Sequence, residues 1–162
     1  MRVLGIDPGL ASVGWGIVES KQNRLSHIAR GTIKTASKES TTYRLKQIYQ
    51  EIQTIIQEYK PDEAALETLY FAKNITSALP VAQARGVQIL ACADGGLPIG
   101  EYTPLEIKQA VVGNGRAQKH QVEHMVYILL GLREKEKSDH ATDALAAAIC
   151  HINRGGAFCG IV

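Results

Sequence analysis

The alternation of apolar and polar residues over the first 35 positions predicts β-strands. Residues 2–6 are apolar and end at Asp-Pro-Gly, which is typical of a buried strand that meets a turn. Residues 13–18 form a second candidate strand, whose two glycines indicate close backbone approach. Residues 24–35 alternate well enough for a third strand. Because the connections between these runs are short, we expect an antiparallel meander.

After residue 40 the apolar positions recur every three or four residues, as they do on one face of a helix. Residues 41–59 are therefore predicted to form an amphipathic helix that ends before Pro61. A short apolar run between two acids predicts a fourth strand over residues 63–67. The remaining predicted elements are a helix over 74–93 that is bent or interrupted at Pro80 and Gly86, a strand over 99–103, and helices over 105–112, 118–130 and 139–153. This order predicts an α/β fold with one mixed five-stranded sheet flanked by helices.

Length and composition place this pattern in one domain. The chain has 162 residues, of which 45% are hydrophobic, and this content excludes a disordered protein. We assign residues 1–153 to a single domain and residues 154–162 to a short C-terminal tail. The net charge of +2 does not by itself indicate a nucleic-acid partner, because a total conceals how charge is distributed.

The three cysteines form no C-x-x-C pair, which argues against a disulfide framework or a zinc site and favours a reducing compartment. No stretch approaches the roughly 20 apolar residues that a membrane span requires. We therefore expect a soluble, cytoplasmic protein without a membrane partner.

Two acids stand at the ends of predicted strands. Asp7 closes the first strand and Glu67 closes the fourth, and the ends of neighbouring strands on either side of a helical crossover lie together. Two carboxylates would repel each other there unless a hard divalent cation lay between them. The alternative is a solvated edge at which Asp7 only forms a turn.

The last predicted helix carries a further candidate pair. Ser138 is a suitable N-cap, and His140 and Asp143 are three residues apart, so they share a helix face and could share a metal ion. The run of small residues that follows would let this helix lie close to the sheet. The alternative is that Asp139 and Asp143 only complement the positive end of the helix.

Basic and aromatic residues suggest contact with a nucleic acid. Lys108, Arg116 and Lys119 surround a Gly-Asn-Gly turn, where cations and backbone amides could contact phosphate. Tyr70 and Phe71 follow Glu67 closely and could stack on an unpaired base. The alternatives are that the lysines are only solvated surface residues and that Tyr70 and Phe71 belong to the hydrophobic core.

Several motifs together resemble the bacterial RuvC family of Holliday junction resolvases. They are Gly5-Ile-Asp-Pro-Gly9, the acid Glu67 followed by an aromatic residue and Ala72-Lys-Asn74, Gln83-Ala-Arg-Gly86, Ile107-Lys-Gln109 with the segment Gly113 to Lys119, and Asp143-Ala-Leu-Ala146. The motifs occur in order over nearly the whole chain. The resemblance implies a ribonuclease H-like fold, a homodimer, and magnesium-dependent cleavage of four-way DNA junctions in recombination and repair. It also implies work alongside the RuvA–RuvB branch-migration motor.

The resemblance also implies roles for individual residues. The family's metal-binding acids correspond to Asp7, Glu67 and Asp143, and a fourth position falls on His140, with Asp139 as the competing candidate. Two Mg²⁺ ions in each site, for which Mn²⁺ could substitute, would make a nucleophile from water and stabilise the leaving 3′ oxygen. Paired symmetric nicks with 5′-phosphate and 3′-hydroxyl ends are the expected products.

The same family pattern implies which residues contact DNA. Tyr70 corresponds to the aromatic residue that probes the junction centre, and Phe71 is the alternative. Lys108 and Lys119 correspond to positions near the scissile phosphate, where Lys119 would offset charge during catalysis. The DNA-contacting set is completed by Lys73, Asn74 and Arg116.

Three other functions compete with this hypothesis. Actin-like ATPases share the first strand motif, but their two lobes need roughly twice this length. A YqgF-type or RNA-cutting nuclease would prefer a substrate other than the four-way junction. A non-catalytic module would bind the junction without nicking it, and the acids that the chain retains argue against this.

Overall fold

The structure is a computed structural model that describes residues 1–68, 75–133 and 139–156. Within these residues lies one five-stranded sheet with the order β3-β2-β1-β4-β5. The strands are β1 (Arg2–Asp7), β2 (Ser12–Lys21), β3 (Arg24–Lys34), β4 (Glu63–Glu67) and β5 (Ile99–Tyr102). β1, β2 and β3 pair antiparallel, whereas β4 lies parallel to both β1 and β5. The predicted meander and mixed sheet are both present.

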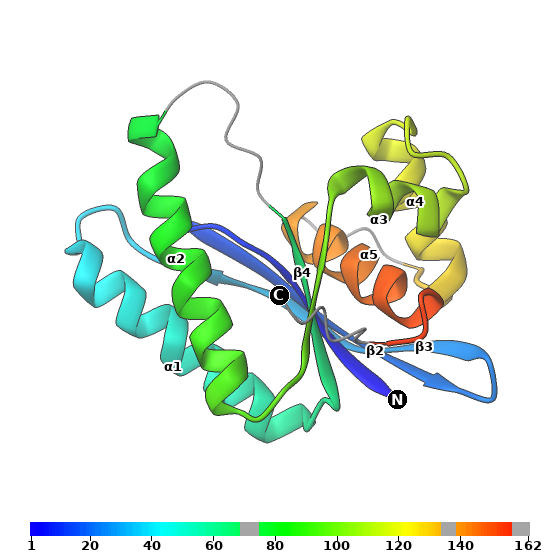
Figure 1. The fold of residues 1–162 in the computed structure, drawn as a ribbon, viewed down its shortest axis with the longest axis horizontal. Coiled ribbons are helices and arrows are strands. Elements are labelled where there is room, and N and C mark those ends of the chain that lie inside the picture. The colour runs from blue at the N-terminus through cyan, green and yellow to red at the C-terminus, as the bar shows by residue number, and fades with distance from the viewer. Residues whose placement is uncertain (69–74, 134–138, 157–162) are drawn as a thin grey trace.

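Helices cover the two faces of the sheet (Figure 1). α1 (Thr41–Tyr59) and α2 (Ile75–Asp94) lie on one face, and α3 (Pro104–Val112), α4 (Lys119–Leu130) and α5 (Asp139–Asn153) lie on the other. Each set encloses its own apolar cluster against the sheet. α2 continues through Pro80 and Gly86, so of the predicted bend or interruption the interruption is absent. No helix in the described ranges has the length and apolar character of a membrane span.

A row of small residues lets α5 lie directly on the sheet. The strand register aligns Gly16 with Gly5, Gly5 with Ala65, and Ala65 with Gly100, so the row crosses β2, β1, β4 and β5. A Cβ atom added to Gly5 would lie 1.9 Å from the carbonyl oxygen of Ala144 in α5. Any larger residue in β1 at this point would therefore force the helix away from the sheet.

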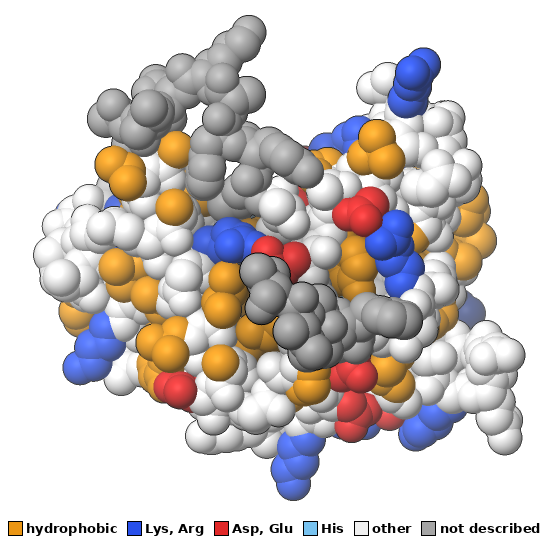
Figure 2. Space-filling model, viewed as in Figure 1, with side chains coloured by type: hydrophobic (Ala, Val, Ile, Leu, Met, Phe, Trp, Pro, Cys, Tyr) orange, Lys and Arg blue, Asp and Glu red, His pale blue; other side chains and the backbone are white. Residues whose placement is uncertain are grey.

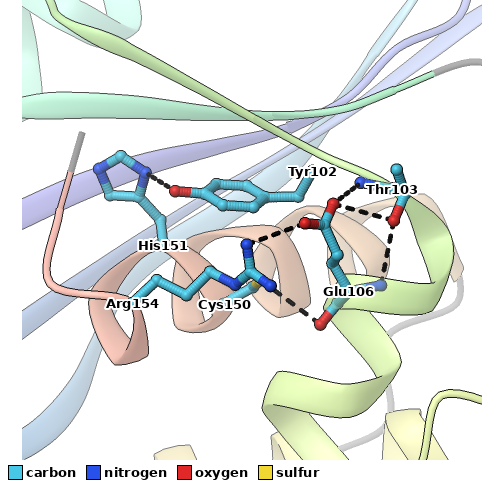
Figure 3. Close-up of polar contacts among 6 residues, drawn as sticks. All are labelled: Tyr102, Thr103, Glu106, Cys150, His151 and Arg154. Carbon is cyan, nitrogen blue, oxygen red and sulfur yellow. Dashed lines mark hydrogen bonds and ion pairs between the residues drawn. The ribbon is translucent and has the colours of Figure 1, made fainter. Parts of the chain in front are cut away.

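Buried polar contacts hold the C-terminal half of α5 (Figure 3). The Tyr102 hydroxyl lies 2.9 Å from His151 Nδ1. On the other side of the ring, His151 Nε2 lies 2.6 Å from a Glu63 carboxylate oxygen. Because the carboxylate can only accept a hydrogen bond, a neutral His151 carries its proton on Nε2 and accepts a hydrogen bond from the Tyr102 hydroxyl at Nδ1. Just beyond the helix, Arg154 pairs with Glu106 of α3 at 2.8 Å. These contacts fix the direction in which the N-terminal end of α5 points.

Candidate metal centre

Strand register places two acids next to each other at one edge of the sheet. Ile6 of β1 pairs with Leu66 of β4, so Asp7 and Glu67 end adjacent parallel strands. Side chains alternate between the two faces of a strand, so Asp7 lies on the same face as Gly5, beneath α5. The predicted convergence of the two strand-ending acids is present in the structure.

The first turn of α5 brings further ligand groups to Asp7. A Cβ atom on Gly14 of β2 would lie 2.0 Å from the carbonyl oxygen of His140, so this glycine lets the helix begin directly over the sheet. His140 Nδ1 lies 2.7 Å from Asp7 Oδ2. Ligand atoms of Asp7, His140 and Asp143 all lie within 4.8 Å of one another. These three side chains could hold a metal ion and are called the metal cluster below; Glu67 ends the neighbouring strand and is outside this group of three.

Lys119, the first residue of α4, faces the same helix. Its Nζ atom lies 2.9 Å from Asp143 Oδ2 and 3.6 Å from Asp139 Oδ2. The Asp139 side chain is 65% exposed, and among the described residues it is outside the metal cluster. Of these two candidates, His140 is the one whose ring nitrogen lies close to the carboxylates of Asp7 and Asp143.

A pocket of about 270 Å³ opens beside the metal cluster, and Glu67, Lys108, Lys119 and Asp143 line it. A larger groove of about 1160 Å³ lies at the opposite end of β1, near Met1. No carboxylate is among the described residues that line the larger groove, whereas the smaller pocket beside the metal cluster combines acids with cations.

Burial and mutual repulsion raise the pKa values of the strand-ending acids. Burial, together with the charges of Asp7 and Asp143, raises the pKa of Glu67 to about 7. Burial also raises the pKa of Asp7, although the hydrogen bond from His140 opposes this shift. Burial alone would lower the pKa of Lys119, but the hydrogen bond to Asp143 and nearby acids raise it overall. Lys119 is therefore a permanent cation at neutral pH.

The donor set fits a hard divalent cation. Carboxylate oxygens are the ligands that Mg²⁺ and Mn²⁺ prefer, and imidazole is compatible with several divalent metals. Burial first, and then the charges of Asp7 and Asp143, raise the pKa of Glu67, and a bound cation would oppose both effects. The residues present thus fit a bound metal ion.

The remaining predicted site residues have different positions. Arg116 is exposed in the loop before α4, where its backbone N–H donates to Asn114 Oδ1 at 3.0 Å. The predicted DNA contacts Tyr70, Phe71, Lys73 and Asn74 lie outside the described residues. The sequence analysis did not single out Thr35 and Gln88, which hydrogen-bond to the loop that follows Asp7. For Gln88, the available signal was a polar residue on the inner face of a largely apolar helix.

A mixed sheet whose adjacent parallel strands end in acids, with a third acid on a helix laid across it, defines a metal-dependent nuclease of the ribonuclease H-like class. Comparison with known proteins agrees with this class. The family model described as crossover junction endodeoxyribonuclease RuvC matches residues 3–151. The chain belongs to the RuvC family. The predicted family, ribonuclease H-like fold and endodeoxyribonuclease activity are thereby confirmed.

Individual relatives and solved structures agree with this assignment. The chain is 51% identical to the RuvC of Alkaliphilus metalliredigens over 155 residues, which cover 96% of this chain and 94% of the relative. It is 50% identical to the RuvC of Clostridioides difficile, with 93% and 89% covered. The structure of T. thermophilus RuvC in complex with a Holliday junction substrate superposes with a TM-score of 0.90 at 32% identity, covering 95% of this chain and 94% of that one.

Proposed function

We propose that this protein resolves four-way DNA junctions by Mg²⁺-dependent hydrolysis during recombination and repair. Paired symmetric nicks would leave 5′-phosphate and 3′-hydroxyl ends. The observation that carries the proposal is the convergence of Asp7, His140 and Asp143 within 4.8 Å, beside a pocket lined by Glu67 and two lysines. The likeness to a RuvC solved with its junction substrate supports the choice of DNA.

Asp7, Glu67, His140 and Asp143 would hold two Mg²⁺ ions, with Mn²⁺ as a possible substitute. When bound, the ions supply an activated water and stabilise the leaving 3′ oxygen. The hydrogen bond between His140 Nδ1 and Asp7 Oδ2 orients both side chains and leaves His140 Nε2 available as a ligand. Burial and the neighbouring acids raise the pKa of Glu67 to about 7, and a bound cation would favour its ionised, metal-binding form.

Two lysines would receive the DNA backbone. Lys108 and Lys119 line the same pocket as Glu67 and Asp143, so a phosphate that enters it meets two ammonium groups. Lys119 retains its charge because its pKa is raised, and it can offset negative charge that develops at the scissile phosphate. Arg116, exposed in the neighbouring loop, would contact an adjacent part of the backbone.

Residues that follow Glu67 would contact the junction centre. We assign the role of the stacking wedge to Tyr70, with Phe71 as the alternative, and backbone contacts to Lys73 and Asn74. Replacement of Tyr70 by alanine should reduce junction cleavage more than replacement of Phe71. The reverse order, measured on the same junction, would transfer the wedge role to Phe71.

Two active sites are needed for two symmetric nicks, and we propose a homodimer that joins through α2. Leu79 and Leu90 are 59% and 53% exposed on this helix, and Figure 2 shows hydrophobic side chains along it. A Cβ atom on Gly86 would meet nothing within 4 Å, so nothing in the described protomer explains a mid-helix glycine, which costs about 1 kcal/mol relative to alanine. Close approach of a second copy would explain it.

The RuvA–RuvB motor is the further partner that family membership suggests.

The decisive experiment combines a mobile four-way junction with purified protein. In Mg²⁺ the wild type should produce paired nicks at symmetric positions. Asp7→Asn should bind the junction in Ca²⁺ with wild-type affinity and lose cleavage in Mg²⁺. Asp139→Asn is the matched control, because this acid lies one residue before the cluster and should show a milder loss. Binding without nicks by the wild type would instead indicate a non-catalytic junction-binding module, and normal cutting by Asp7→Asn would refute the metal centre.

A further inference from the structure

The loop that follows Asp7, residues 8–11, has its carbonyl oxygens bound by two other parts of the chain. Three successive carbonyls accept hydrogen bonds: Gly9 O from Gln88 Nε2 at 3.2 Å, Leu10 O from Thr35 Oγ1 at 2.6 Å, and Ala11 O from Thr35 N at 3.1 Å. Gln88 belongs to α2, and Thr35 comes directly after β3. The loop is therefore held by residues far away in the sequence.

Gln88 is an unusual residue for its position. Its side chain is fully buried next to an apolar cluster, and its Oε1 atom has no hydrogen-bond partner among the described residues. A buried amide that is only partly satisfied costs about 1–3 kcal/mol. Methionine would fill a similar volume without this cost, so packing does not explain the glutamine. Among the described residues its amide bonds the carbonyl of Gly9, a backbone group that itself needs a donor.

Thr35 holds the loop from a second direction. Thr35 is buried, with 8% of the residue exposed, and its hydroxyl donates to Leu10 O while it accepts a hydrogen bond from Arg44 Nε of α1 at 2.8 Å. The hydroxyl therefore joins α1 to the loop. On the face of the sheet opposite the metal cluster, α2 therefore bonds the loop directly through Gln88, and α1 is linked to it through Thr35.

The loop leaves Asp7 little freedom to move. A Cβ atom on Gly9 would lie 2.2 Å from Ser12 O, so the chain turns tightly before β2 begins. Asp7 stands at the start of this turn, with its carboxylate 2.7 Å from His140. A displacement of Gly9 would be transmitted through Pro8, whose ring restricts the backbone, to Asp7.

We propose that Gln88 and Thr35 are positioning residues for the metal cluster: by binding the carbonyls of residues 8–11, they hold the Asp7 carboxylate where it can bind metal. This inference rests on the proposed metal centre and adds two residues that contact neither metal nor DNA. Groups that orient metal ligands commonly contribute about 10- to 100-fold to metal affinity.

The test measures Mn²⁺ binding to the DNA-free protein by isothermal titration calorimetry. Gln88→Met and Thr35→Val should each weaken Mn²⁺ binding about tenfold, and Thr35→Ser, which keeps the hydroxyl, should restore it. The Mg²⁺ concentration for half-maximal cleavage should rise in parallel, while junction affinity in Ca²⁺ stays within about twofold, because the electrostatic DNA contacts are unchanged. Cys92→Ala is the matched control: Cys92 is also fully buried in α2, so this variant should lose thermal stability and keep Mn²⁺ affinity.

Wild-type Mn²⁺ affinity in both Gln88→Met and Thr35→Val would overturn the inference, whatever their thermal stability. Equal weakening in Thr35→Ser and Thr35→Val would also overturn it, because the hydroxyl would then be irrelevant. Asp7→Asn separates this inference from the proposed metal centre. If Asp7→Asn binds Mn²⁺ with wild-type affinity, the proposed metal centre itself is wrong. If Asp7→Asn loses Mn²⁺ affinity and the Gln88 and Thr35 variants do not, the metal centre stands and the positioning role is refuted.

Discussion

Removal of the negative charge of Glu67 from the metal-free centre should stabilise the protein, but only at a pH high enough for this carboxyl to be ionised in the wild type. The Glu67 carboxyl has a pKa of about 7 in the folded chain, against 4.5 for an ordinary glutamate. The folded state thus binds this proton more tightly than the unfolded state, so stability should fall as pH rises from about 4.5 to about 7 and then level off. At about 1.4 kcal/mol for each pH unit the loss is at most roughly 3 kcal/mol, and solvent screening of the half-buried carboxyl reduces it to about 2 kcal/mol.

Glu67→Gln should recover this free energy. In EDTA at pH 8 the variant should melt about 4–8 °C above the wild type, whereas at pH 4.5 the two should melt together. Thermal unfolding followed by circular dichroism measures both values. Glu51→Gln, an exposed position on α1, should show no such difference. The same Tm gain at both pH values, or none at pH 8, would refute the idea that repulsion and burial destabilise an ionised Glu67. Cleavage in Mg²⁺ should be lost in Glu67→Gln, because the amide is a poorer metal ligand.

Three further predictions concern α5 and its neighbours. Gly5→Ala should lower the free energy of unfolding by about 2–3 kcal/mol in urea titrations, because the new methyl group would overlap the α5 backbone. Tyr102→Phe removes one buried hydrogen bond and should cost about 1 kcal/mol in the same assay with cleavage preserved. Lys119→Met should slow single-turnover cleavage about 100-fold while Mn²⁺ binding is kept or tightened, since the ion pair with a metal ligand is gone; unchanged cleavage would exclude a role at the phosphate.

Elements with a strong local pattern could be predicted almost to the residue. The helix over 41–59 and the strand over 63–67 have the predicted bounds, because their apolar periods are regular and Pro61 separates them. The adjacency of Asp7 and Glu67 followed from topology alone, since a helical crossover between parallel strands brings their ends together. Predictions of this kind need only the order of the elements.

The contacts around Asp7 could not be predicted in the same way, because they depend on how the elements pack. Nothing in the local pattern of α2 pairs Gln88 with a carbonyl 79 residues earlier, and Thr35 looks like an ordinary strand end. His140 was a candidate from its spacing to Asp143, but its 2.7 Å contact with Asp7 depends on the depth at which α5 lies.

The depth at which α5 lies on the sheet connects the fold to the proposed metal centre. α5 crosses the sheet over Gly14, Gly5 and Gly100, and in each case an added Cβ would lie within 2.5 Å of a backbone or side-chain atom of the helix. Each glycine weakens its own strand, because it packs no side chain and loses more entropy on folding. A stable sheet alone would favour larger residues there. The glycines are instead explained by the helix, because only a helix in direct contact with the sheet brings its carboxylate and imidazole within reach of the acid that ends β1. The same residues that weaken the strands thus bring together the side chains of the proposed metal centre.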